Sequence, residues 1–129
     1  MITEPVAAAL AFGVDRQPNQ KKQVLVFDFG GGTHDVTILE IYKRMISVKA
    51  IEGDNSLGGQ DIDIELMNLC LERFNDENGT NLCLKSAQED DPNVLNNKQK
   101  ARLRKECKQV KEALTGSTTQ AEISIDNFH

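Results

Sequence analysis

Hydrophobic and polar positions alternate along the chain in blocks that predict an α/β protein. Residues 24–29 form a continuous apolar run, which is typical of a central strand covered on both faces. Apolar positions within residues 36–41 and 46–50 predict two further strands. Residues 42–44 would connect these two strands as an antiparallel pair.

A short apolar helix is predicted ahead of the strands, between Thr3 and Gly13. Thr3 can cap the free amides of its first turn, Pro5 is tolerated there, and Gly13 can take the left-handed closing conformation. Because a helix of about ten residues that is apolar all round is not stable alone in water, we expect it to lie between other elements. The polar residues 15–22 that follow predict an exposed loop.

Two amphipathic helices are predicted in the second half of the chain. Residues 60–78 carry apolar side chains every four residues and end at Gly79, and residues 97–114 repeat the pattern. The first stripe consists of Ile62, Leu66, Leu69, Cys70 and Phe74, and the second of Leu103, Cys107, Val110 and Leu114.

Two segments of the second half lie outside these helices. Residues 79–97 are irregular and carry an acidic run at residues 89–92, which predicts a solvated excursion. Residues 120–126 alternate apolar and polar side chains, which predicts a half-buried strand. The expected order is therefore helix, three strands, two helices and a strand.

Composition limits the size of the core and the class of partner. A chain of 129 residues with 39% hydrophobic and 5% aromatic content predicts one domain at most, with a modest core. A net charge of -5 argues against a nucleic-acid-binding surface, and no apolar run approaches the roughly 20 residues that span a bilayer. We therefore expect neither a nucleic-acid nor a membrane partner, and a cytoplasmic location.

The cysteines and the basic helix favour structural roles. Three widely spaced cysteines without a Cys-x-x-Cys pair predict reduced, largely buried thiols. Two histidines are too few for a His-rich metal site. Lysines and arginines within residues 97–114 have no interleaved aromatic residues, so we expect a solvated face with one or two residues near an anionic ligand.

Residues 24–36 hold the pattern richest in chemistry. An apolar run delivers Asp28 into a turn of three glycines, followed by Thr33, Asp35 and another apolar run. Consecutive glycines let a phosphate approach the backbone and allow dihedrals that point several amides at one anion. Thr33 adds a hydroxyl donor, and either carboxylate could hold a hydrated magnesium ion or orient a water.

The chain closely resembles the nucleotide-binding domain of the heat-shock-protein-70 (DnaK-type) chaperones, which belong to the actin-like ATPase superfamily. The resemblance rests on ITEPVAAA at residues 2–9, VLVFDFGGGT at residues 24–33, Gly53-Asp54, LGGQD at residues 57–61, Arg102 to Arg104 with Cys107, and residues 124–126. It implies a partial actin-like, ribonuclease H-like fold. The implied architecture is a mixed sheet with antiparallel hairpin strands and flanking helices.

The resemblance implies roles for the residues around the glycine turn. Gly30, Gly31, Gly32 and Thr33 correspond to the second phosphate-binding loop of the family. Asp28 corresponds to the carboxylate near the metal and the attacking water, and Asp35 to its downstream companion. Glu4 corresponds to an acidic residue near the γ-phosphate, Pro5 to a proline that relays nucleotide state, and Gly59 to a position close to the ribose.

The helix over residues 97–114 would supply the contacts to adenosine. The residues that match this part of the family are Lys108, Lys111, Glu112 and Thr115. The family commonly has Glu at the position of Lys108 and Arg at that of Glu112, so two nucleoside contacts are altered in charge, which argues against ordinary ATP affinity. His34 replaces a usual aromatic or aliphatic residue.

Coverage of the family pattern is incomplete and leaves two functions open. The whole chain, residues 1–129, resembles the middle of a nucleotide-binding domain, with the phosphate-loop region at about 1–59 and the helical and strand portion of the second lobe at about 60–129. The first hypothesis is part of a stress-response chaperone ATPase that uses ATP or ADP and Mg²⁺ to drive cycles of peptide binding with cochaperones and unfolded clients. The second is a non-catalytic interaction module; a sugar kinase fits the motifs less well.

The match to only the middle of the family's domain predicts both weak catalysis and self-association. Phosphoryl transfer depends on several elements positioned at once, so we expect little or no ATP hydrolysis by this chain alone. Open strand edges in an interrupted sheet predict self-association.

Overall fold

The structure, a computed structural model, describes residues 1–14, 19–43, 45–116 and 118–125. It divides into two compact units, residues 1–60 (unit 1) and residues 61–129 (unit 2). Residues 15–18, in the segment predicted as an exposed loop, lie outside the described part of the chain.

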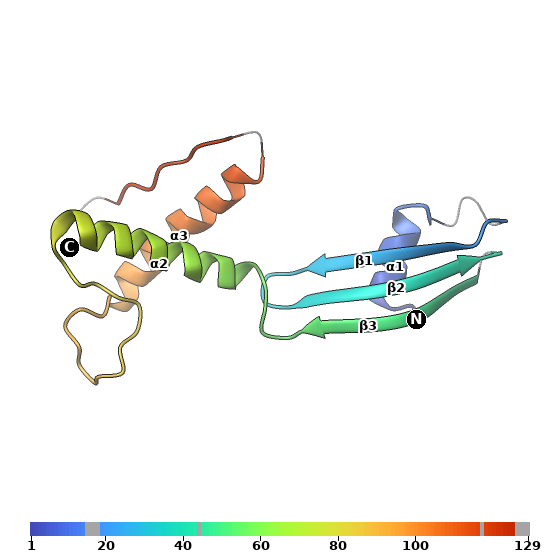
Figure 1. The fold of residues 1–129 in the computed structure, drawn as a ribbon, viewed down its shortest axis with the longest axis horizontal. Helices are drawn as coiled ribbons and strands as arrows, with labels where there is room; N and C mark the ends of the chain where they lie inside the picture. Colours follow the sequence, from blue (N-terminus) through green and yellow to red (C-terminus); the bar gives the residue numbers. More distant parts are fainter. Residues whose placement is uncertain (15–18, 44, 117, 126–129) are drawn as a thin grey trace. The chain divides into compact units, whose positions relative to one another are not determined.

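Unit 1 is built on a three-stranded antiparallel sheet (Figure 1). Its strands are β1 (Lys22–Phe29), β2 (His34–Tyr42) and β3 (Met45–Asp54), in the order β1-β2-β3. This arrangement confirms the predicted antiparallel pair, and the expected mixed sheet is represented by its antiparallel part. Lys43, in the connection between β2 and β3, has a left-handed φ of 48°.

The apolar run at residues 24–29 lies at the edge of this sheet, so the prediction of a central, doubly covered strand is wrong. β2 pairs on both sides, whereas β1 pairs only with β2 among the described strands. One face of β1 stays open, and Leu25 and Phe27 are 60% and 61% exposed. An apolar run favours burial, but it does not show that this chain supplies a layer to cover it.

Helix α1 (Glu4–Ala11) packs against β1 and covers the opposite face of the sheet (Figure 1). Thr3 is its N-cap residue but makes no side-chain cap hydrogen bond, in contrast to the prediction. Gly13 takes the predicted left-handed conformation, with φ 78°. The expected burial between two layers is not found in the described chain, because Ala9 is the buried residue of α1 while Phe12 is 89% exposed.

Unit 2 contains most of helix α2 (Gly59–Asn78), whose first two residues belong to unit 1, and all of helix α3 (Asn97–Leu114). α3 has the predicted bounds, and α2 begins one residue before its predicted start. Gly79 ends α2 with a left-handed φ of 65°. Asn96 begins α3 with a capping box, in which its side chain accepts from the Gln99 amide while the Gln99 side chain accepts from the Asn96 amide.

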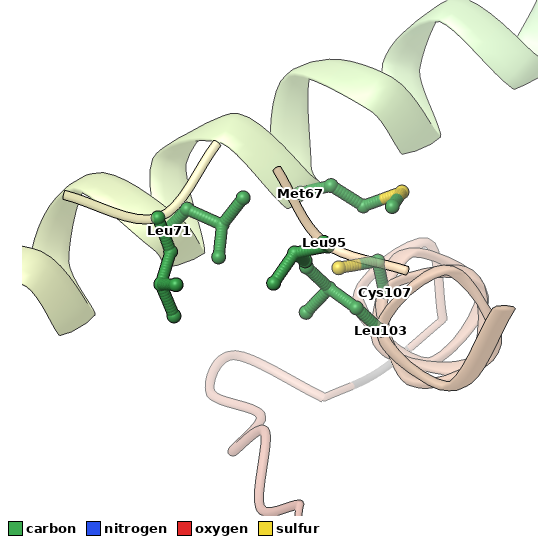
Figure 2. Packing of buried hydrophobic residues seen from close by; sticks show 6 residues of the cluster. Met67, Leu71, Leu95, Leu103 and Cys107 are labelled. Atoms are coloured by element: carbon green, nitrogen blue, oxygen red, sulfur yellow. The ribbon is translucent and has the colours of Figure 1, made fainter. Parts of the chain in front are cut away.

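The core of unit 2 lies where α2 faces α3. Figure 2 shows Met67 and Leu71 of α2 directed toward Leu95, Leu103 and Cys107. The buried centre of α2 is therefore displaced from the predicted stripe, whose members Leu66, Cys70 and Phe74 are only partly buried and Ile62 is exposed.

The segment between the two helices is more firmly held than a solvated excursion. Its ends are tied together by a parallel bridge between Cys83 and Val94, and Leu82 and Leu95 are buried in the core of unit 2. The Asn75 side chain of α2 accepts from the Leu82 amide and donates to the Leu82 carbonyl, both at 2.8 Å. Residues 85–90, which include Glu89 and Asp90 of the acidic run, form the longest exposed stretch of this segment.

The predicted strand at residues 120–126 does not form in its described part, residues 120–125, and Asp126 lies outside the described residues. Ile123 and Ile125 pack against the core of unit 2, but no neighbouring strand offers backbone partners among the described residues. An alternating pattern becomes a strand only where such a partner exists. No helix in the described chain is long and apolar enough to cross a membrane.

Candidate functional site

Asp28 and Asp35 lie directly opposite each other near one end of the β1–β2 ladder. Opposed residues of antiparallel strands point to the same face, so the two carboxylates are neighbours. Asp28 is exposed, although its apolar surroundings in the sequence favoured burial. Like charges at opposed positions are unfavourable, and a bound cation would relieve their repulsion.

These carboxylates line a cavity of about 230 Å³, here called the acidic cavity, at the start of α1. Glu4 brings a third carboxylate to it from the first turn of α1. The full lining is Thr3, Glu4, Pro5, Val26, Asp28, Asp35, Thr37 and Ile51. The structure therefore brings the three predicted acidic residues to one cavity inside unit 1.

The turn between β1 and β2, residues 30–33, is held by three backbone hydrogen bonds. Within the turn, the Gly30 amide donates to the Thr33 carbonyl at 2.8 Å. From the first turn of α2, the Gly59 amide donates to the Gly30 carbonyl at 2.9 Å and the Gln60 amide to the Gly31 carbonyl at 2.8 Å. Gly59, predicted as a nucleoside contact, thus also anchors the glycine turn.

Three successive amides of the turn remain available to a ligand. Among the described residues, the amides of Gly31, Gly32 and Thr33 donate to no protein acceptor, and all three residues are exposed. None of the three turn glycines has a left-handed φ, so the predicted special dihedrals are not what requires glycine here. A Cβ at Gly32 would meet nothing within 4 Å, and one at Gly31 would touch only the end of the Gln60 side chain, at 4.0 Å. The missing side chains leave open space in front of the amides, as an anion-binding loop requires.

Two further glycines shape the site by allowing close approach. A Cβ at Gly58 would lie 2.6 Å from the Gly32 amide nitrogen, and one at Gly53 would lie 2.8 Å from a carboxylate oxygen of Asp35. In the sequence, both glycines stand out only as matches to the family pattern. The register reveals the role of Gly53, because it is paired with Asp35 across β2 and β3.

The acidic cavity suits a hydrated cation better than a fully coordinated one. Among the described residues, no three acidic, histidine or cysteine side chains converge closely enough to hold a metal ion. Mg²⁺ is commonly held by one or two carboxylates together with phosphate oxygens and waters, which fits the opposed pair Asp28 and Asp35 beside an open amide turn. The residues present therefore fit the predicted metal.

His34 lies on the other face of the sheet, away from the acidic cavity. Its ring is 4.6 Å from the Phe27 ring and 5.5 Å from the Phe29 ring, centroid to centroid. Its Nε2 atom is buried without a hydrogen-bond partner in the described chain. His34 therefore acts as an aromatic packing residue beside the turn.

The predicted adenosine contacts all lie on or beside α3, in unit 2. Lys111 pairs with the buried carboxylate of Asp63 on α2, and the Thr115 hydroxyl donates to the Glu112 carbonyl at 2.7 Å. Lys108 and Glu112 form an exposed ion pair at 3.9 Å. The two residues whose charges depart from the family pattern are thus partners of each other.

The family described as Hsp70 protein matches residues 1–129. This chain belongs to the Hsp70 family. It is 52% identical to a chaperone protein DnaK of Thermus thermophilus over 82 residues, which are 64% of this chain and 13% of that protein. It is 39% identical to a heat shock cognate HSP70 protein of Trypanosoma brucei brucei over 129 residues, which are 99% of this chain and 18% of that protein.

Membership of the Hsp70 family gives the fold its context. The ATPase domain of this family has an actin-like fold, and the three-stranded sheet with its flanking helices is a partial α/β piece of it. The chain spans less than a fifth of the length of these two relatives. The sequence-based family and fold assignments are therefore confirmed.

Proposed function

We propose that unit 1 binds the phosphate groups of ATP or ADP together with Mg²⁺, as one side of a nucleotide site. The observation that carries this proposal is the row of three open amides, Gly31 to Thr33, beside the opposed carboxylates of Asp28 and Asp35. Family membership supports nucleotide as the ligand. The same geometry accounts for an anion and a cation bound side by side.

Phosphate oxygens are held by the glycine turn in this proposal. The amides of Gly31, Gly32 and Thr33 donate to them, and the exposed Thr33 hydroxyl adds a fourth donor. The hydrogen bonds from Gly59 and Gln60 fix the carbonyl side of the turn, so its amides are oriented before the ligand arrives.

The carboxylates of the acidic cavity act on waters in this proposal. Asp28 and Asp35 would hold a hydrated Mg²⁺ by accepting hydrogen bonds from its waters, and Glu4 lines the same cavity from α1. In a complete site, a carboxylate oxygen of Asp28 would orient the attacking water and accept its proton. Bound Mg²⁺ supplies neutralisation of the phosphate charge.

Lys108, Lys111 and Thr115 are the proposed contacts of unit 2 to the nucleoside. Lys111 is 21% exposed at its side chain and already pairs with Asp63, so it would contribute a positioned charge. In the longer protein, we infer that nucleotide binding drives cycles of peptide binding with cochaperones and unfolded clients in the cytoplasm. This part of the proposal rests on the family alone.

This chain by itself is proposed to bind phosphate without substantial ATP hydrolysis. Unit 1 contributes the proposed phosphate-binding turn and the acidic cavity, whereas phosphoryl transfer needs charge neutralisation from several directions. Turnover of MgATP is expected to be at background in the wild type and in Asp28→Asn. Clear turnover that disappears in Asp28→Asn would contradict the proposed inactivity.

The binding site itself is tested by amide chemical shifts. Titration with MgADP should shift the amide signals of Gly31, Gly32 and Thr33 far more than that of Gly79, which lies at the end of α2 in unit 2. Shifts confined to other residues, or no shifts, would count against the proposed turn. MgCl₂ alone is the control for effects of the ion.

A non-catalytic interaction module is the second candidate. The exposed apolar side chains Leu25, Phe27 and Phe29 on the open face of β1 favour it, as does the charge-reversed pair of Lys108 and Glu112. Under this alternative, MgADP would leave all amides of the glycine turn unshifted.

A further inference from the structure

Thr37 is a buried polar residue of the acidic cavity. It lies on β2, is 2% exposed, and lines the cavity together with Asp28 and Asp35. Along β2 it stands two positions after the exposed Asp35 and two positions before the buried Leu39, so the three residues share one face of the sheet. Thr37 therefore marks the boundary between the carboxylates and the apolar interior of unit 1.

The Thr37 hydroxyl has no protein partner within the described chain. Its cross-strand neighbours are Val26 on β1 and Ile51 on β3, whose side chains are apolar. No described residue forms a hydrogen bond with the hydroxyl, and its oxygen is nonetheless not sealed from solvent. Because the residue as a whole is buried, the accessible side of the hydroxyl is the side that faces the cavity.

Valine would suit this position better than threonine if nothing bound there. The two side chains have nearly the same shape and both favour strands, but a buried hydroxyl without a partner costs free energy. A ligand that reaches the hydroxyl through the cavity offsets this cost. Residues two apart on a strand have Cα atoms about 7 Å from each other, so a water bridges Thr37 and Asp35 more readily than a direct hydrogen bond does.

We propose that the Thr37 hydroxyl positions a hydrated divalent cation in the acidic cavity by accepting a hydrogen bond from one of its waters. This inference rests on the proposed function and extends the magnesium site from the two carboxylates to a neutral residue deeper in the sheet. Waters bound to Mg²⁺ donate hydrogen bonds, and a hydroxyl oxygen has lone pairs to accept them. Thr37 is a positioning residue, with no contact to phosphate.

The test is titration of the 129-residue chain with MgCl₂ in the absence of nucleotide, followed by NMR at constant ionic strength set with NaCl. We expect a saturable shift of the Thr37 methyl signal together with the amide signals of Asp28 and Asp35. The methyl signal of Thr80 is the control, because the Thr80 hydroxyl already donates to Asn75 in unit 2. A Thr37 signal that moves no more than that of Thr80 would overturn the proposal without the need for any variant.

Two variants separate the hydroxyl from the shape of the side chain. Thr37→Val should weaken Mg²⁺ binding about fivefold, the ratio that matches one lost hydrogen bond, while Thr37→Ser should bind within about twofold of the wild type. In urea unfolding without Mg²⁺, Thr37→Val should have a midpoint at or above that of the wild type, because it removes a buried hydroxyl that has no protein partner. Equal Mg²⁺ affinities for wild type and Thr37→Val, or a clearly lower unfolding midpoint for Thr37→Val, would refute the positioning role.

Titration with MgADP distinguishes this inference from the proposed function. If wild type and Thr37→Val bind MgADP equally well, Thr37 does not position the ion, although the nucleotide site stands. If Mg²⁺ alone shifts the Thr37 signal but MgADP causes no further shift in the glycine turn, the phosphate proposal fails while the role of Thr37 stands.

Discussion

Glycine suits four positions of unit 1 for two different physical reasons. At positions 53 and 58, a Cβ would collide with backbone atoms at 2.5 and 2.6 Å, so these glycines permit packing. At positions 31 and 32, a Cβ would meet at most a flexible side-chain end, so packing does not demand glycine. The open positions, 31 and 32, face the proposed phosphate, so we assign them to ligand binding. The crowded positions, 53 and 58, are assigned to stability.

Substitution of Gly58 and Gly32 by alanine should separate these reasons. Gly58→Ala must displace the glycine turn and should lower the free energy of unfolding by about 1–3 kcal/mol. Gly32→Ala should change it by less than about 0.5 kcal/mol, because no atom is displaced, yet should weaken MgADP binding. Urea unfolding followed by circular dichroism, with a parallel binding titration, measures both; equal stability losses would contradict the assignment.

The buried thiol of Cys107 makes stability depend on alkaline pH. Burial raises its pKa in the folded chain to about 12 from an ordinary value of 9.0, so the folded chain holds a proton that the unfolded chain releases. Its contribution to stability is therefore complete below about pH 9 and is lost as pH rises toward about 12. Unfolding of wild type and Cys107→Ala over this range measures the effect, and wild-type stability should fall more steeply; parallel curves would contradict this assignment.

At the scale of elements, the ion pair between Lys111 and Asp63 links α3 to α2. The Asp63 side chain is 7% exposed, so its charge depends on Lys111 for a partner in the core of unit 2. The Lys108–Glu112 pair differs from the Lys111–Asp63 pair in exposure and in location. Both of its side chains are more than 60% exposed, and both lie on α3.

Removal of the two lysines should therefore have unequal effects. Lys111→Met leaves a buried carboxylate without its partner and should lower the free energy of unfolding by about 1–3 kcal/mol. Lys108→Met removes a solvated pair and should cost about 0.5 kcal/mol or less. Helical circular dichroism during urea unfolding reports on α2 and α3. Equal losses for the two variants would show that Asp63 does not depend on Lys111.

Elements were predictable from sequence where local rules decide them. Gly79 carries the end signal of α2 and Asn96 the start signal of α3, and both helices form within one residue of their predicted bounds. The edge position of β1 and the missing strand at residues 120–125 were not predictable, because each depends on whether a neighbouring strand exists. A run of apolar residues such as that of β1 is compatible with a central strand and with an edge strand.

Some residues of the candidate site could likewise be predicted from local sequence, and others could not. Asp28 and Asp35 could be assigned from their spacing around the glycine turn, since that spacing makes them cross-strand neighbours in a hairpin. Gly53 and Gly58 could not, because their roles come from a third strand and from the start of α2. Spacing predicts pairs within a hairpin but not what approaches it from elsewhere.

At the scale of the whole molecule, the described sheet of unit 1 ends in two unpaired edges, β1 and β3. An apolar edge strand favours pairing with another chain, and a charged side chain on it opposes pairing. We therefore retain the prediction that the chain self-associates.

Sedimentation velocity across micromolar concentrations tests this association. Leu25→Lys on β1 should shift the chain toward monomer, whereas Leu69→Lys on α2, an equally exposed position at 60%, should leave association unchanged. A wild type that stays monomeric throughout the range would contradict the prediction. An equal effect of both variants would assign association to general apolarity and not to the edge of β1.

The central claim is that the glycine turn and the acidic cavity form a phosphate and magnesium site within this Hsp70-family chain. Calorimetric titration with MgADP tests it most directly, with Asp28→Asn as the variant and Asp76→Asn, at an exposed position of α2, as the matched loss of one charge. We predict saturable binding by the wild type and by Asp76→Asn, and at least about tenfold weaker binding by Asp28→Asn, a difference of about 1.4 kcal/mol. Absence of binding by the wild type, or equal affinities for wild type and Asp28→Asn, would contradict the claim.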